Sequence, residues 1–292
     1  MKKFKIKRKP RELRINRSRA GDIAILIFIS LYGIVLVLPL IYAISQSLKP
    51  LSELWAFPPR FFVENPTLKN FKDLLNLTSD SWVPFSRNIL NTVLISVVGT
   101  GGHLIMSAMC AYVFAKHNFP GRNFMFNMVV LSLMFSSAVT GIPSYIIMTK
   151  LHLLDSLYSV ILPAFGSSLG LYLMKQFMET NIPDTLLEAA RIDGSSEWNT
   201  FWRIVMPLVK PASLTLIIFS FQGLWNMGAT TYIQSEQNKT INFVLSQIAN
   251  GGVARQGTTA AATVIMMLVP IIMFVVSQSN IVETVATSGM KD

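Results

Sequence analysis

Long stretches without Asp, Glu, Lys or Arg alternate with short polar segments along the chain. A helix of about 20 apolar residues suffices to cross the hydrocarbon core of a bilayer. Six stretches approach or exceed this length: Ile23–Ser45, Ile89–Phe114, Phe124–Thr149, Ser159–Met174, Leu214–Ile233 and Thr258–Ser277. The fourth becomes long enough only if its helix continues past Lys175 to Met178. The pattern predicts an all-α, polytopic membrane protein with six transmembrane helices.

The composition excludes an ordinary soluble globule. Hydrophobic residues make up 51% of the chain and charged residues only 14%, whereas about a quarter of the residues in a soluble domain are charged. The single cysteine, Cys110, excludes a disulfide framework. The three histidines show no metal-ligand spacing.

The net charge of +10 comes almost entirely from the N-terminus, where residues 1–19 hold ten Lys/Arg and one Glu. A basic tail that leads directly into a membrane span is expected to meet anionic lipid headgroups, and no nucleic-acid partner is expected. The apolar run from residue 23 is longer than that of a secretory signal peptide, so we expect a retained helix.

The basic tail also predicts the orientation, because cytoplasmic flanks carry the excess of Lys and Arg. Six spans then place both termini in the cytoplasm, together with the basic loop Lys116–Arg122. The expected regions are a basic cytoplasmic tail (1–22), a first transmembrane helix (23–45), an extracytoplasmic loop (46–88), a five-helix core (87–281) and a cytoplasmic C-terminus (282–292).

The spans contain no acidic or basic side chain in their middle. Secondary carriers usually keep such residues in the bilayer for ion coupling, so a carrier is disfavoured. His103, in the second span, is more typical of a hydrogen-bonded helix contact than of a proton relay. Because the chain also has no G-x-x-x-x-G-K-[ST] phosphate loop, a transporter of this kind needs its energy from another subunit.

One catalytic pattern occurs, Gly166-Ser167-Ser168-Leu169-Gly170, which matches the G-x-S-x-G nucleophile elbow. That motif needs a strand before it and a helix after it, and here it opens a membrane span. The same residues match G-x-x-x-G, whose small side chains let helices approach closely. Close packing is favoured over an intramembrane hydrolase, which needs Ser168 to meet a histidine.

A polar interruption separates the fourth and fifth spans, from Met178 to Val209. Asn181 is expected to cap a short helix with Pro183 and Asp184 in its first turn, and Gly194 is expected to end it. A second short helix, capped by Ser195 or Ser196, is expected to end at Pro207.

The second helix carries an aromatic stripe, because Trp198, Phe201, Trp202 and Val205 recur at helical spacing. Aromatic residues on a cytoplasmic surface need a place to be buried. The residues alone leave two options open: a partner subunit, or the headgroup layer of the membrane.

The segment resembles the EAA loop of bacterial ABC importer permeases. That family's pattern is E-A-A-x₃-G-x₉-I-x-L-P. The chain has Glu188-Ala189-Ala190, then Gly194 after three residues, then Ile204-Val205-Met206-Pro207 after nine. Met206 in place of Leu is the only departure. Further segments are similar to the carbohydrate branch with the maltose-type permeases: Phe119-Pro120-Gly121-Arg122, Ile182-Pro183, Ile192-Asp193-Gly194, Trp225-Asn226 and Ser288–Asp292.

The resemblance implies a type I ABC importer permease fold and a coupling loop, residues 179–207, that docks on the ATPase subunits. The coupling residues that it implies are Glu188, Ala189, Ala190, Arg191, Asp193, Gly194, Ile204 and Pro207. It implies no enzyme activity and no cofactor in this chain, since ATP and Mg²⁺ are bound by the partner ATPases.

The resemblance also implies the rest of the assembly: a second homologous permease subunit, two ABC ATPase subunits and an extracytoplasmic solute-binding protein, in a bacterial cytoplasmic membrane. The outer loops, with Trp55 and Trp82 in the first and Gln234–Gly257 as the second, would face the binding protein. The implied cargo is a sugar, with an oligosaccharide favoured. A non-sugar solute and, further off, a secondary carrier remain as alternatives.

Candidate residues of the transport path lie at the outer end of the fifth span. Sugar sites favour an aromatic face and amide or hydroxyl groups, which Gln222, Trp225, Asn226 and Tyr232 supply. Packing of Trp225 between helices is the competing interpretation. Family members often place an acid soon after the Trp-Asn pair, and here Met227 follows directly.

Overall fold

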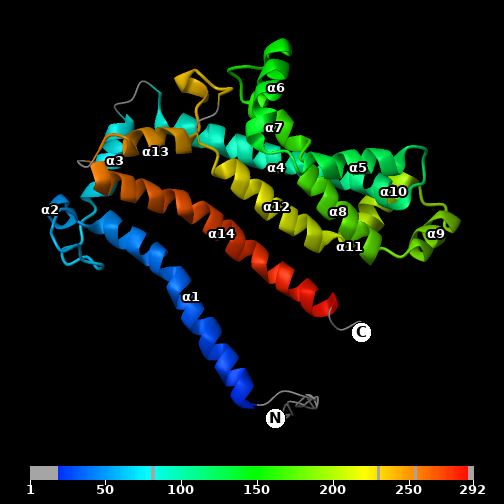
Figure 1. Cartoon of the computed structure of the whole chain (residues 1–292), viewed down its shortest axis with the longest axis horizontal. Helices are drawn as coiled ribbons and strands as arrows, with labels where there is room; N and C mark the ends of the chain where they lie inside the picture. The colour runs from blue at the N-terminus through cyan, green and yellow to red at the C-terminus, as the bar shows by residue number, and fades with distance from the viewer. Residues whose placement is uncertain (1–18, 80–82, 229–230, 253–254, 289–292) are drawn as a thin grey trace, which may run out of the picture.

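The computed structural model describes residues 19–79, 83–228, 231–252 and 255–288. The basic tail up to residue 18, Trp82 and the C-terminal residues from 289 lie outside the described residues. Within the described ranges all regular elements are helices and no strand occurs (Figure 1). The expected all-α class is confirmed.

The helices fall into three size classes. The long ones are α1 (Arg19–Leu48), α4 (Phe85–Lys116) and α14 (Gln256–Ser288). Those of intermediate length are α3 (Lys69–Ser79), α5 (Arg122–Ser132), α6 (Ser137–Lys150), α7 (Tyr158–Phe165), α8 (Ser168–Asn181), α9 (Asp184–Ile192), α12 (Lys210–Trp225) and α13 (Ile241–Ala249). The shortest are α2 (Leu51–Leu54), α10 (Glu197–Thr200), α11 (Met206–Leu208), a π-helical turn (Phe201–Val205) and a 3₁₀ turn (Glu236–Asn238).

Three predicted spans are long helices that can cross a membrane by length and composition: Ala20–Leu48 of α1, Phe85–Lys116 of α4 and Gln256–Val276 of α14. A fourth is possible if Glu197–Leu208 and Lys210–Trp225, which meet at 78°, form one bent span. The predicted fifth span is shorter than expected, because α12 ends at Trp225 rather than at Ile233.

The prediction of one continuous helix over 124–149, and of another over 159–178, is wrong. The first run is divided between α5 and α6, where Ser136 takes an extended conformation (φ −72°, ψ 152°) ahead of α6. The second is divided between α7 and α8 at Gly166 and Ser167 (φ −65°, ψ 118°). Neither serine hydroxyl makes a capping hydrogen bond, so the two breaks rest on the extended backbone at these positions and not on serine capping.

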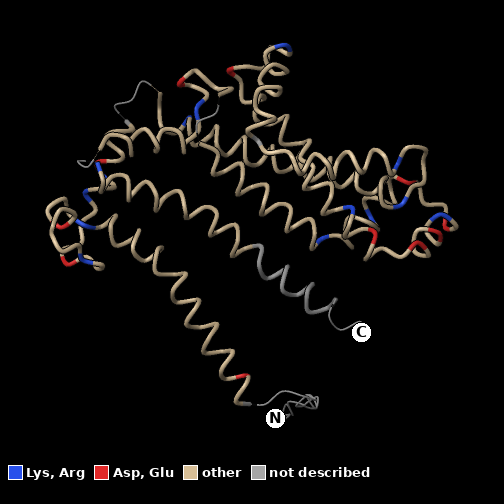
Figure 2. The backbone as a smooth tube through the Cα atoms, viewed as in Figure 1, with Lys and Arg blue, Asp and Glu red and all other residues tan. Residues whose placement is uncertain are grey.

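The long helices and α12 run obliquely through the molecule (Figure 1). The short helices α2, α3 and α13 gather near one end of these helices, and α9 and α10 lie near the other end of α4. The helices α6 and α7 project to one side. Charged residues lie along α9, in the loops and near the ends of the long helices, and the middle parts of the long helices are free of them in the described residues (Figure 2). This distribution of charged residues is typical of helices that cross a membrane.

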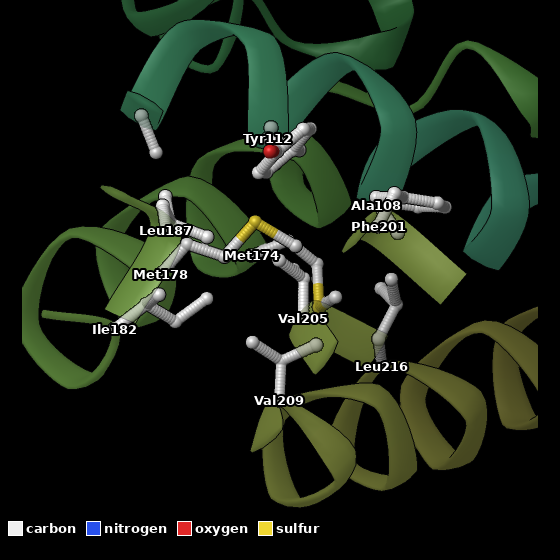
Figure 3. Packing of buried hydrophobic residues seen from close by; sticks show 12 residues of the cluster. Ala108, Tyr112, Met174, Met178, Ile182, Leu187, Phe201, Val205, Val209 and Leu216 are labelled. Atoms are coloured by element: carbon white, nitrogen blue, oxygen red, sulfur yellow. The ribbon is translucent and has the colours of Figure 1, made fainter. Parts of the chain in front are cut away.

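The main core lies where α4 meets α8 and α12. It contains Ala108, Ala111, Tyr112, Ala115, Met174, Met178, Ile182, Leu187, Phe201, Val205, Val209 and Leu216 (Figure 3). Its members come from α4, from the ends of α8 and α12, and from the predicted coupling loop, residues 179–207, between them. The predicted coupling loop is therefore part of the folded body.

Candidate functional site: the coupling loop and its attachments

The first coupling helix, α9, begins two residues later than expected. Its N-cap is Pro183, and Asn181 instead ends α8, where its side-chain amide donates to the Phe177 carbonyl at 3.1 Å. Two hydrogen bonds close the other end of α9: the Gly194 amide donates to the Arg191 carbonyl at 3.0 Å, and the Ser195 amide to the Ala190 carbonyl at 2.9 Å. This pair is a Schellman motif, with Gly194 at φ +76° as its left-handed residue.

One face of α9 is buried and the other is exposed. Leu187 and Ala190 face the core, whereas Glu188, Ala189, Arg191 and Asp193 are exposed. Ile192, which the sequence analysis did not select, is 87% exposed at the tip of the helix. Exposed large apolar side chains beside small ones are typical of a docking surface.

The aromatic stripe of the second coupling helix is split between two environments. Phe201 and Val205 are buried in the core (Figure 3). Trp198 is 61% exposed and Trp202 is 37% exposed. The two tryptophans line an open groove together with Gly194, Ser195, Ser196, Asn199 and Arg203. Ser196 is the cap of α10, because its hydroxyl accepts from the Asn199 amide.

Pro207 does not end the second helix, contrary to expectation. A π-helical turn, Phe201–Val205, comes before it, and the helix continues to Leu208 before the chain bends into α12. A proline ring clashes with the carbonyl four residues earlier in a regular helix, and a wider turn relieves that clash. Ile204 is half-buried and Pro207 is exposed.

Two polar attachments, which the sequence analysis did not anticipate, fix the coupling loop to the end of α4. The Lys116 ammonium donates to the Ile182 carbonyl at 2.6 Å and to Asp184 Oδ1 at 2.8 Å. The Tyr112 hydroxyl donates to Glu197 Oε2 at 2.9 Å, and Arg191 Nε donates to Glu197 Oε1 at 3.1 Å. The first attachment holds the start of α9, and the second joins its last turn to α10 and α4.

The attached carboxylates are held in their charged form. The hydrogen bond from Lys116 and its positive charge lower the pKa of Asp184 below its ordinary value. Partial burial alone raises the pKa of Glu197, but hydrogen bonds from Tyr112 and Arg191 outweigh it, so the net pKa is lowered. His117 Nε2 also lies 3.5 Å from Glu197 Oε2. Both attachments thus persist at neutral pH.

The expected transport-path residues are not gathered in one place. Trp225 is buried, stacks on Phe221 at 5.7 Å and donates its indole N–H to the Met266 carbonyl of α14 at 3.2 Å. Gln222 and Asn226 are exposed at the end of α12. Tyr232 stacks on Tyr145 of α6, with ring centroids 6.3 Å apart. The geometry of Trp225 is that of a packing residue between helices.

The G-x-S-x-G segment acts in packing. A Cβ atom on Gly170 would lie 2.1 Å from His103 Nε2, so only glycine allows this approach of α8 to α4. The Ser168 hydroxyl lies 2.6 Å from that of Ser132, and His103 Nδ1 lies 3.0 Å from the Ser220 hydroxyl. Among the described residues, Ser168 therefore has no histidine partner. No group of three His, Cys, Asp or Glu residues in these ranges could hold a metal ion.

The opposite end of α4 holds the loop between α12 and α13 through side chains that were not predicted from the sequence. The Asn91 amide donates to the carbonyls of Gln237 and Lys239 at 2.8 and 3.2 Å. Asn88 donates to the Lys239 carbonyl at 3.0 Å, and Arg87 Nε to the Gln237 carbonyl at 3.1 Å. Polar residues in the first turns of an otherwise apolar span were the available signal.

Asp155 fixes the same loop from another side. Its carboxylate accepts from the amides of Gln234 and Ser235 at 3.0 and 2.8 Å, and its carbonyl accepts from the Asn238 side chain at 2.6 Å. The Ser235 amide contributes most to lowering the pKa of Asp155 below its ordinary value.

Comparison with known proteins identifies the kind of chain. A model of the family described as "binding-protein-dependent transport system inner membrane component" matches residues 103–285. Protein LplC of Bacillus subtilis (strain 168) is 33% identical over 232 residues, which cover 79% of this chain and 76% of LplC. The arabinooligosaccharides transport system permease protein AraQ of the same organism is 27% identical over 271 residues, or 92% of this chain and 95% of AraQ.

A solved structure has the same fold. A chain from a bacterial ABC transporter involved in the import of the acidic polysaccharide alginate matches with a TM-score of 0.76 at 22% identity, over 91% of this chain and 99% of that chain. The family match contains α8, the whole coupling loop and α12. The chain is thus a membrane-embedded transport component, not a catalytic subunit, and ATP hydrolysis resides in a separate partner. It belongs to the family of binding-protein-dependent transport system inner membrane components.

Proposed function

We propose that this permease carries a sugar, with an oligosaccharide as the favoured cargo, and that residues 179–207 couple it to two ATPase subunits. The exposed face of α9 and the adjacent tryptophan groove support the coupling assignment. Ile192, Trp198 and Trp202 are apolar and exposed on a segment whose other side is locked into the core. Such a surface suits a protein partner, in which aromatic residues are frequent anchors.

The sugar assignment draws on the relatives. AraQ is named for arabinooligosaccharides and the solved transporter for the polysaccharide alginate. The two cargoes share a chain of pyranose or furanose rings and differ in charge. A sugar oligomer is the cargo class common to them.

The proposed assembly contains this chain, a second homologous permease, two ATPase subunits and an extracytoplasmic solute-binding protein in a bacterial cytoplasmic membrane. Both termini and the coupling loop face the cytoplasm. The loop held by Asn88, Asn91 and Asp155 then faces the binding protein from outside. The proposed coupling residues are Glu188, Ala189, Ala190, Arg191, Asp193, Gly194, Ile204 and Pro207. The proposed path residues are Gln222, Asn226 and Tyr232, and Trp225 supports them by packing.

Charge reversal on α9 tests the coupling assignment. Glu188 is exposed, so Glu188→Lys leaves the core intact and changes only the docking surface. We expect the ATPase subunits to bind the permease pair in nanodiscs at least tenfold more weakly, which corresponds to about 1.4 kcal/mol. The measurement is a binding titration with purified ATPase.

The matched control is Glu64→Lys, the same reversal at an exposed acid near the other end of the long helices. It is expected to bind ATPase as the unsubstituted protein does. If Glu188→Lys bound the ATPase as tightly as the unsubstituted protein does, α9 would not belong to the docking surface.

The cargo is tested by calorimetry of the cognate binding protein with neutral oligosaccharides, acidic oligosaccharides and non-sugar solutes. Binding of one of the two oligosaccharide classes is expected. Binding of a non-sugar solute alone would contradict the sugar assignment.

A further inference from the structure

Helix α4 is fastened at both ends to segments far away in the sequence. At one end, Lys116 and Tyr112 hold the coupling loop through Ile182, Asp184 and Glu197. The Lys116 side chain is only 5% exposed, whereas that of Asp184 is 79% exposed, so the bond to the Ile182 carbonyl is the one partly shielded from water. Truncating Lys116 is costly because this carbonyl loses its donor.

At the other end, four side chains within two turns of α4 hold the loop from Gln237 to Ile241. Arg87, Asn88 and Asn91 donate to the carbonyls of Gln237 and Lys239. The Thr92 hydroxyl accepts from the Ile241 amide at 2.9 Å. Because these bonds go to main-chain atoms, they fix the path of the loop whatever its side chains are.

Between these attachments α4 is continuous. It has 32 residues, or about 48 Å at 1.5 Å per residue, and no proline. Each of the other long helices, α1 and α14, contains a proline, Pro39 and Pro270, and prolines are the usual sites of kinks. Among the long helices that the structure describes, α4 is the one without a proline, and it stays helical through Gly99, Gly101 and Gly102.

The two helices that flank the coupling loop in the chain, α8 and α12, are less suited than α4 to transmit motion of that loop. On one side α8 begins at Ser168 and is separated from α7 by a non-helical break. On the other side α12 meets the loop at a bend of 78° and ends at Trp225, after 16 residues. Neither provides an unbroken helix from the coupling loop to the loop at Gln237.

We propose that α4 is the lever of the transporter, by which we mean a rigid helix that transmits motion from one of its ends to the other. It carries displacement of the coupling loop to the loop Gln237–Ile241 at its other end, with Lys116 and Asn91 as the positioning residues of the two attachments. The proposal rests on the proposed function of residues 179–207 as the ATPase-docking segment. It assigns a route by which nucleotide binding on one side of the membrane changes the surface offered on the other.

The test uses the assembled transporter in nanodiscs, with its second permease and ATPase subunits. Cys110 is the only cysteine, so Cys110→Ser gives a clean background for a single fluorophore at Gln237→Cys. The Gln237 side chain is exposed and the attachment uses its carbonyl, so labelling leaves the bonds in place. The trigger is MgATP followed by vanadate, and the readout is the change in fluorescence.

The expected result is a clear vanadate-induced change in the otherwise unsubstituted protein and in Lys116→Arg, which keeps the cation. The change falls at least fivefold in Lys116→Met at one end and in Asn91→Leu at the other, while the ATPase rate without binding protein stays within twofold. Lys210→Met and Asn250→Leu, both exposed positions, are the controls and respond normally. Rescue by arginine separates positioning from mere packing.

Two further variants keep the outcome decisive. If Lys116→Met does not assemble, Tyr112→Phe replaces it, since that change removes only the hydroxyl bond to Glu197, and the signal is expected to fall at least twofold. A normal response in these variants, with a defective response in Glu188→Lys, overturns the lever and leaves the coupling loop standing. A normal response in Glu188→Lys as well overturns the coupling assignment itself.

Discussion

At the scale of single residues, the left-handed conformation of Gly194 has the largest consequence. Its φ of +76° closes α9 and directs the chain into α10. No atom lies within 4 Å of the position that a Cβ would occupy there, so space is available and the backbone alone restricts the residue. Gly194 was predicted as the end of the helix from sequence, because glycine at the C′ position is a strong signal.

The effect of a substitution at Gly194 on this turn should therefore depend on the backbone preference of the new residue and not on its size. Gly194→Val is expected to strain the turn by about 1–2 kcal/mol and to open the last turn of α9. Trypsin should then cleave after Arg191 roughly tenfold faster in the purified protein. Gly194→Asn, which tolerates the left-handed region, is the control and should remain within about twofold. Equal cleavage of the two variants would mean that the turn does not depend on this conformation.

The role of Trp225 could not be predicted from its residue type and its position in the span. Its type and position in the span suited a sugar-facing aromatic residue, yet its indole N–H is bonded to Met266, 41 residues away. A sequence without its tertiary contacts cannot distinguish an aromatic ring at a path from one between two helices. The same holds for Asn91, whose partners are main-chain carbonyls, and for the bond from Lys116 to the Ile182 carbonyl, since every sequence contains such carbonyls.

At the scale of elements, the hydrophobic pattern located the apolar runs, but it did not predict which of them form one continuous helix. Helices α1, α4 and α14 lie where continuous runs predicted them. The run at 124–149 is also free of charged residues, and that at 159–178 contains only Lys175. The breaks fall at serine and glycine positions that a helix also tolerates. Only packing decides such cases, because the energetic preference of one serine for an extended conformation is small.

The loop between α12 and α13 offers an element-scale prediction. Asp155 accepts from the Gln234 and Ser235 amides, and such bonds contribute about 1 kcal/mol. Asp155→Ala should accelerate hydrogen exchange of these two amides roughly fivefold. The control is Glu236→Ala in the same loop, which should leave them unchanged. Exchange at the unsubstituted rate in Asp155→Ala would mean that the carboxylate does not hold the loop.

The pH dependence of this contact follows from the lowered pKa of Asp155. A carboxylate with a lowered pKa in the folded state contributes its stability above its unfolded pKa and loses it as the pH falls through the lowered value. Protection of the two amides, corrected for intrinsic exchange, should therefore be constant between pH 5 and 8. A loss of protection between pH 7 and 5 would be inconsistent with a lowered pKa.

At the scale of the whole molecule, charge lies near the two ends and at the tip of the α6–α7 projection (Figure 2). The proposed orientation places the coupling loop inside and the loop at Gln237 outside. In a Cys110→Ser background, a membrane-impermeant maleimide should label Gln237→Cys in intact cells and should label Ser195→Cys only after the cells are opened. The reverse pattern would invert the orientation derived from the basic tail.

The arrangement of α1 has a consequence for synthesis. None of the most apolar part of α1 is buried within this chain, and the span it mainly packs against is α14, the last to be made. While the ribosome completes the intervening residues, α1 must therefore reside in lipid without that neighbour. The most apolar 18 residues of its 29-residue span have a mean hydropathy of 2.8, which makes the helix stable there alone. Helix α1 can thus anchor the nascent chain before the later helices are made, and its contact with α14 forms only once α14 has been made.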